Sequence, residues 1–183
     1  MPEKTSFSKT TIGERKSSEY GTPLDFYLKL DEVFNFVLDP CAFPDNRLHV
    51  PKFYTKQDDG LIRRWIWNTF INPPFGTKKG ENIRAWIQKM KKESELSPYY
   101  HYVMLLPLRI ESRWFQEEIL DDYDGLIYAI KGRLVFFNSE KNKNNNPHPI
   151  GTVLYIRSNN FTTDMAYRLK ELIPGEYICK RPL

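Results

Sequence analysis

Apolar positions recur along the chain with two different spacings, and these spacings predict its helices and strands. Helical spacing predicts helices that start at residue 23 and cover residues 83–90, 112–120 and 161–172. Short apolar runs predict strands over residues 34–39, 66–71, 101–107, 125–130, 134–137 and 150–156. Strands that alternate with helices, followed by a strand-rich end, predict an α/β sheet with an antiparallel edge strand.

Turn and capping residues refine this prediction at two places. Thr22 is an expected helix N-cap, with Pro23 in the first helical position and Asp25 completing a capping box. The runs at 125–130 and 134–137 flank a "KGR" turn and are typical of a hairpin. Residues 1–17 are expected to form a flexible tail, and residues 138–149 a polar loop.

Composition narrows the class of protein. The 183 residues are 40% hydrophobic, which is enough for one globular domain. The net charge of +4 is compatible with a polyanionic partner but does not require such a partner. There is no apolar run of 18 residues and no apolar signal core, so we expect a soluble, intracellular protein. Two cysteines without a CxxC pair and three scattered histidines predict neither a disulfide framework nor a structural metal.

Unusual polar residues stand at the ends of two predicted strands: Asp39 in "LDPCA" and Asn72 in "NPPF". In an open α/β sheet, ligands gather at the carboxyl ends of the strands. A carboxylate at such an end can accept hydrogen bonds from a ribose hydroxyl or the amino group of a cofactor. The alternative for Asp39 is a helix or turn cap.

Asn72 lies in a stretch suited to holding a planar amine. Its amide oxygen and a proline carbonyl can both accept hydrogen bonds from one exocyclic NH2 group, because two prolines fix the backbone. Phe75 then offers a flat face on which a base can stack. The alternative is a rigid turn between strand and loop.

The ordered motifs extend this interpretation to a family. The segments, in order, are "EYGTPLDFYLKLDEVFNFVLDPCA", "KFYTKQDDGLIRRW", "FINPPFG", "MLLPLRIESRWF", "AIKGRLVFF" and "PHPIGTVLYI". In order and spacing they resemble the phage-type DNA adenine amino-methyltransferases, the Dam-like family, over most of residues 18–157. The resemblance implies a Rossmann-like class I methyltransferase domain over residues 18–183.

The resemblance also implies residue roles. It assigns catalysis to Asn72, Pro73, Pro74 and Phe75, which would hold the target adenine. It assigns S-adenosylmethionine binding to two groups: Tyr20, Thr22 and Pro23, and Asp39, Pro40, Cys41 and Ala42. Candidate DNA contacts are Lys78, Lys79, Arg109 and Arg113, the last two in a patch with Trp114. A second role open to Arg109 is to brace the catalytic loop. Lys78 and Lys79 are equally explained as solvent-exposed charges, and Cys41 as a small buried filler.

Two departures from the family pattern bear on the cofactor. The Gly-x-Gly loop of many class I methyltransferases is missing, and Arg64 stands where the family often has an acid. Asp58 and Asp59 are then weak candidates for contact with the adenosine.

The implied activity is methylation of the exocyclic amino group of adenine in double-stranded DNA. The target base would flip out of the duplex, and the methyl group would move by direct displacement without a metal or a covalent enzyme intermediate. The expected location is the cytoplasm of a prokaryotic host, with a phage gene as one origin. Two alternatives stay open: methylation of an RNA base or protein amide, and an inactive nucleic-acid-binding relative. Residues 138–149 are either a DNA-contacting arm or a disordered insert.

Overall fold

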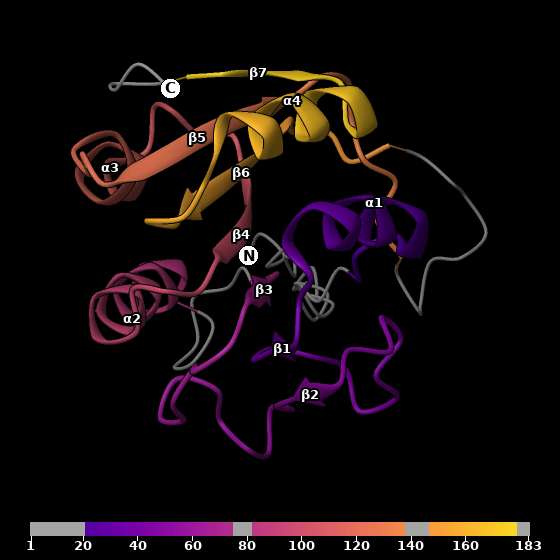
Figure 1. Cartoon of the computed structure of the whole chain (residues 1–183), viewed down its shortest axis with the longest axis vertical. Helices are drawn as coiled ribbons and strands as arrows, with labels where there is room; N and C mark the ends of the chain where they lie inside the picture. The colour runs from indigo at the N-terminus through magenta and orange to yellow at the C-terminus, as the bar shows by residue number, and fades with distance from the viewer. Residues whose placement is uncertain (1–20, 75–81, 138–146, 179–183) are drawn as a thin grey trace, which may run out of the picture.

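The computed structural model describes residues 21–74, 82–137 and 147–178, and within them the chain forms a seven-stranded mixed sheet with helices on both faces (Figure 1). The strands are β1 (Leu38–Asp39), β2 (Lys52–Phe53), β3 (Thr69–Ile71), β4 (Tyr102–Pro107), β5 (Gly125–Ile130), β6 (Thr152–Arg157) and β7 (Gly175–Tyr177). Their order across the sheet is β2-β1-β3-β4-β6-β5-β7.

Strand direction divides the sheet into two halves. Strands β2, β1, β3 and β4 are parallel, so their carboxyl ends lie along one edge. Strand β6 runs antiparallel between β4 and β5, and β7 pairs antiparallel with β5 at the far edge. This arrangement confirms the α/β class and is consistent with the class I methyltransferase fold. The antiparallel strand expected only at the edge is thus also found inside the sheet.

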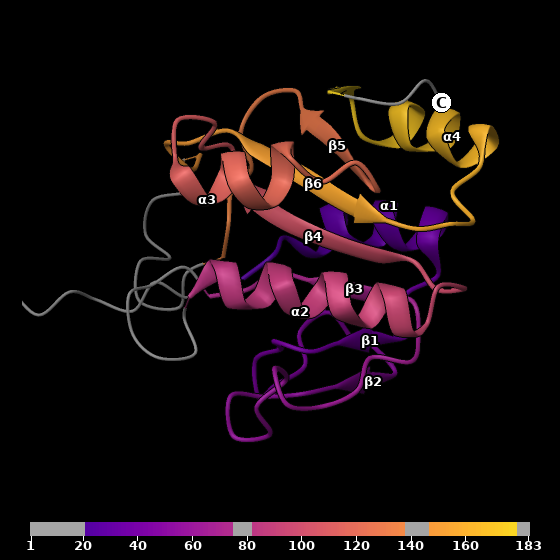
Figure 2. The ribbon, with the colours of Figure 1, turned by 90° about the vertical axis from the view of Figure 1, so that its left-hand side faces the viewer.

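Helices cover the two faces of the sheet in pairs (Figures 1 and 2). Helices α1 (Leu24–Phe34) and α4 (Thr163–Leu172) pack on one face, through a core that includes Leu30, Phe34 and Leu169. Helix α2 (Ile83–Leu96) covers the other face with α3 (Arg113–Phe115) and the π-helical turn η1 (Gln116–Leu120) that continues it. Within the described segments, no helix is long and apolar enough to cross a membrane.

The start and end of α1 differ from the sequence prediction. Pro23, not Thr22, is the N-cap; its carbonyl accepts the amide of Tyr27, and no side chain caps the helix. The helix ends at Phe34, and its C-cap Asn35 adopts a left-handed conformation with φ of 50°. The Asp31 carboxylate then accepts the amide of Phe36, at 2.7 Å. This turn leaves only Leu38 and Asp39 of the predicted strand 34–39 in β1.

The predicted hairpin at 125–137 is wrong. Its first strand is β5, but residues 134–136 form no strand, and Phe137 pairs instead with Gly21 in an isolated antiparallel bridge. Strand β6 becomes the partner of β5, because its six buried residues can pair on both sides within the sheet interior. The short strands β2 and β7 were not predicted from the sequence.

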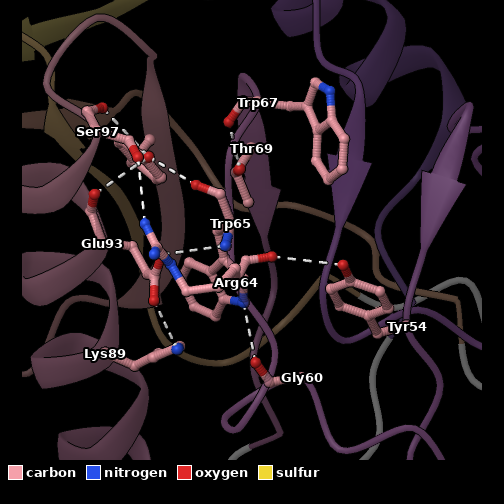
Figure 3. A network of polar contacts seen from close by, with 10 residues as sticks. Tyr54, Gly60, Arg64, Trp65, Trp67, Thr69, Lys89, Glu93 and Ser97 are labelled. Carbon is pink, nitrogen blue, oxygen red and sulfur yellow. Dashed lines mark hydrogen bonds and ion pairs between the residues drawn. The ribbon is translucent and has the colours of Figure 1, made fainter.

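A buried ionic network joins α2 to the loop that precedes β3 (Figure 3). Glu93 is only 1% exposed, and its carboxylate accepts bonds from Lys89 Nζ at 2.7 Å, Arg64 Nε at 2.9 Å and the Trp65 amide at 3.0 Å. Burial disfavours the charged form, but these three donors outweigh it and lower the pKa of Glu93. Trp65 is fully buried and belongs to the core on the α2 face of the sheet.

Candidate active site

The two polar strand ends meet at one pocket. Strands β1 and β3 are parallel neighbours, so Asp39 at the end of β1 and Asn72 directly after β3 lie at the same edge of the sheet. The pocket at this edge is lined by Gly21, Thr22, Asp39, Cys41, Ala42, Phe43, Asn46, Arg47, Leu48 and Asn72. The fold therefore brings together five of the residues singled out from the sequence: Thr22, Asp39, Cys41, Ala42 and Asn72.

Asp39 is a buried carboxylate in this pocket. It is 5% exposed, and its Oδ1 accepts the backbone amide of Cys41 at 2.9 Å. Burial raises the pKa of Asp39 to about 7, although the hydrogen bonds from Cys41 oppose this shift. A buried carboxyl group with a raised pKa ionises more readily when a ligand offers it further hydrogen-bond donors.

Asn72 is oriented by the residue that the sequence suggested as a helix cap. Its Nδ2 donates to Thr22 Oγ1 at 3.0 Å, which links the stretch after β3 to the chain just before α1. An amide whose nitrogen is engaged in this way has its oxygen turned to the opposite side. Thr22, which is buried, thus fixes the direction in which the Asn72 oxygen can accept a hydrogen bond.

Cys41 lies between the two motifs. Burial and the nearby Asp39 carboxylate raise the pKa of its thiol well above the ordinary value, while the backbone amide of Asn72 acts in the opposite direction. The thiol therefore stays protonated near neutral pH and behaves as a small packing group with a weak donor. In the described part of the chain, no group of three or more His, Cys, Asp or Glu side chains is arranged to hold a metal ion.

Besides Gly21, four pocket residues were not identified from the sequence: Phe43, Asn46, Arg47 and Leu48. They lie in the irregular segment between β1 and β2, whose fold depends on Asn46. This residue has φ of 42°, and its side chain both donates to the Val50 carbonyl and accepts the Val50 amide. An Asn close behind a polar strand end was the signal that could have indicated a structured loop here.

Other predicted residues do not line the pocket. Pro40 and Pro73 are buried, Pro74 is half-buried and Pro23 caps α1. Arg109 is exposed, 3.9 Å from Glu111, and Arg113 pairs with Glu117 at 2.7 Å. Trp114 packs edge-on against Phe115.

The weak adenosine candidates do not line the pocket. Asp58 accepts the amide and the hydroxyl of Thr55, and these bonds lower its pKa. Asp59 accepts the Leu61 amide, at 3.2 Å. Arg64, in the place where the family often has an acid, pairs with Glu93. The remaining predicted residues, Tyr20, Phe75, Lys78 and Lys79, lie outside the described residues.

The chain is similar to a family model and to a curated protein. A family model described as DNA N-6-adenine-methyltransferase (Dam) matches residues 9–171. A protein of Escherichia phage T1, named DNA N-6-adenine-methyltransferase, is 26% identical over 153 residues, which make up 75% of this chain and 61% of that relative. The chain thus spans less than two thirds of the length of the curated relative that it matches.

Proposed function

The chain belongs to the DNA N-6-adenine-methyltransferase (Dam) family, and on this premise we propose that it transfers a methyl group from S-adenosylmethionine to the exocyclic amino group of adenine in DNA. One observation carries the proposal: Asp39 and Asn72, from two separate motifs, line one pocket at the carboxyl ends of adjacent parallel strands. We propose the cytoplasm of a prokaryotic host as the location of this activity.

The Asp39 carboxylate and the apolar groups of the pocket fit such a cofactor. The Asp39 carboxylate would accept hydrogen bonds from ribose hydroxyls or an amino group, and Ala42, Phe43 and Leu48 offer apolar surface for a planar ring. When bound, S-adenosylmethionine supplies an electrophilic methyl group on a cationic sulfur. A buried carboxylate in the same pocket is electrostatically suited to a cationic ligand.

Asn72 would act on the amine that receives the methyl group. The lone pair of an aromatic amine is delocalised into its ring, so the amine is a poor nucleophile. Acceptors at the Asn72 amide and the adjacent proline carbonyl would hold its hydrogens and favour the pyramidal geometry of attack. They would also stabilise the positive charge that develops on the nitrogen as the bond to carbon forms.

The target adenine would have to leave the duplex to reach this pocket, because its amino group is paired inside the helix. We propose that the base flips out toward Asn72. The candidate contacts Arg109 and Arg113 are exposed at the carboxyl end of β4, along the same sheet edge, where they are available to phosphates.

Product analysis tests the reaction. Unmethylated DNA is incubated with labelled S-adenosylmethionine and digested to nucleosides, which are identified by mass spectrometry. The expected product is N6-methyl-2′-deoxyadenosine. Methylcytosine alone would contradict the choice of base. If DNA stays unlabelled while RNA or protein incubated in parallel takes up the label, the substrate class is contradicted.

Variants of the two motif residues test the site. Asn72→Ala should lower single-turnover methylation by about 10²-fold or more, as removal of a preorganised polar group does elsewhere, with little change in cofactor affinity. Asp39→Ala should weaken cofactor binding by at least about tenfold. Thermal melts serve as the control, because a turn with no catalytic role predicts losses of activity only in proportion to the unfolded fraction.

A further inference from the structure

The pocket carries opposite charges at two places. Among the described residues that line it, Asp39 and Arg47 are the acidic and basic side chains. Asp39 is buried at the strand end, whereas the Arg47 side chain is 40% exposed. A ligand that carries a carboxylate is repelled by the first group and attracted by the second.

Arg47 is held in place by contacts on two sides of its guanidinium group. Its Cζ lies 3.7 Å from the centroid of the Phe137 ring, and its Nε donates to Asp45 Oδ2 at 2.6 Å. Phe137 is itself fixed, because it exchanges two backbone hydrogen bonds of 2.8 Å with Gly21, another pocket residue. Stacking on an anchored ring restricts the side chain before any ligand arrives.

The guanidinium group has capacity for a further partner. It offers five N–H donors in a planar fork, and in the described part of the chain its hydrogen bond to Asp45 uses only Nε. The ion pair with Asp45 joins two side chains that are 40% and 53% exposed, so it contributes little stability by itself. A planar fork with donors remaining is suited to bind a carboxylate.

We propose that Arg47 binds the carboxylate at the amino-acid end of S-adenosylmethionine and thereby selects ligands that carry this group. The inference rests on the proposed function, since it names a contact within the cofactor site. The ligand's carboxylate then lies on the Arg47 side of the pocket, and its hydroxyl and amino donors face Asp39.

Calorimetry with two related ligands tests the contact. S-adenosylhomocysteine keeps the carboxylate, whereas 5′-methylthioadenosine keeps the adenosine and sulfur but lacks the amino-acid end. Arg47→Ala should weaken binding of S-adenosylhomocysteine by at least about tenfold and change binding of 5′-methylthioadenosine by less than about twofold. Arg47→Met, which retains an apolar stem over Phe137 but no charge, should behave in the same way.

Arg168 provides a matched control. Its side chain is 42% exposed and paired with Glu32 and Glu171 on the α1–α4 side of the sheet, away from the residues that line the pocket. Arg168→Ala should leave binding of both ligands unchanged.

Three results would overturn the inference. If Arg47→Ala weakens binding of both ligands equally, Arg47 acts only through packing. The same conclusion follows if Arg47→Met binds S-adenosylhomocysteine as tightly as the wild type does. Unchanged binding of both ligands, together with weaker and less salt-dependent DNA binding in Arg47→Ala, would assign the guanidinium to a phosphate. A wild-type protein that binds neither ligand contradicts the proposed function itself, whereas failure confined to the Arg47 variants leaves that function intact.

Discussion

At the scale of single residues, Thr22 does not cap the helix, although local sequence rules predict that it does. A Thr before a Pro at a helix start is an expected N-cap, but its hydroxyl accepts from Asn72 instead. Capping rules describe competition among groups close in sequence. They cannot anticipate a partner fifty positions away that the sheet brings within 3.0 Å.

The Thr22–Asn72 hydrogen bond leads to a prediction about turnover. Thr22→Val keeps the shape of the side chain but removes the acceptor, so the Asn72 amide loses its fixed orientation. We expect single-turnover methylation to fall by about tenfold or more, while Thr22→Ser retains most of the activity. Cofactor affinity measured in parallel should change less than the rate. Equal rates in the Val and Ser variants would contradict a positioning role.

Asp39 should make the stability of the folded protein depend on pH. Its pKa is about 7 in the folded state against an ordinary value of 3.8, so between these values the folded chain binds the proton more strongly than the unfolded chain does. The contribution of Asp39 to the free energy of unfolding is therefore most favourable at low pH, and this contribution is lost as the pH rises toward 7.

The variant Asp39→Asn, which cannot ionise, isolates this effect. Compared with the wild type, it should gain stability of the order of 2 kcal/mol at pH 8 and clearly less at pH 5, while it binds S-adenosylhomocysteine more weakly. Urea unfolding at the two pH values, without ligand, measures the difference. A stability difference that is the same at both pH values would show that Asp39 is ionised without penalty.

At the scale of elements, the loop between β2 and β3 packs against the "LDPCA" stretch that follows β1. Gly60 lies so close to Pro40 that a Cβ added to it would stand 1.9 Å from the Pro40 carbonyl oxygen. The Gly60 carbonyl in turn accepts the indole N–H of Trp65, at 2.9 Å. The backbone of the "LDPCA" motif therefore depends on a glycine twenty residues later.

Replacing this glycine should disturb both stability and binding. In Gly60→Ala the new methyl group displaces the backbone at Pro40, and we expect a loss of about 1–3 kcal/mol together with weaker binding of S-adenosylhomocysteine. Gly151→Ala is the control, because its Cβ would make only ordinary contacts with Leu108 at 3.7 and 3.8 Å. Denaturant unfolding and calorimetry on both variants distinguish a specific clash from a general effect of alanine.

The Glu93 network should be one of the stronger attachments between α2 and the same loop. Glu93→Ala leaves the buried Trp65 amide without its acceptor and Lys89 without its buried partner, so we expect a loss of about 3 kcal/mol. Because the folded pKa of Glu93 is lowered, the stabilisation is present above its ordinary value of 4.5 and is lost as pH falls below it. Glu93→Gln should lack this acid sensitivity. Unfolding energies of Glu93→Ala within about 1 kcal/mol of the wild type would contradict this role.

At the scale of the whole molecule, the sequence predicted the long strands β4, β5 and β6 better than the short strands and better than the strand pairing. Strand β4 is a continuous, buried apolar run, and β5 matches its prediction residue for residue, because apolar runs of six residues carry a strong local signal. The 134–137 run has the same composition but pairs only through Phe137. Residues 134–137 compete with β6 for pairing with β5, and β6 takes this position. The outcome of such a competition cannot be predicted from the local sequence pattern.

The candidate site was predictable to a similar extent. Asp39 and Asn72 follow from the rule that ligands gather at strand ends, and the fold brings both to one pocket. Arg47 and Phe43 could not be predicted, because their proximity to the pocket depends on the turn that Asn46 makes and on Phe137.

The bridge between Gly21 and Phe137 also has a consequence for when the pocket is completed. It joins positions separated by most of the chain, and contacts of such long sequence separation are costly to close and slow to form. During synthesis, the ribosome releases Asp39 and Asn72 well before Phe137, so the nascent chain has the floor of the pocket before it has the ring on which Arg47 stacks. Ligand binding should therefore be among the last properties that the chain acquires as it folds.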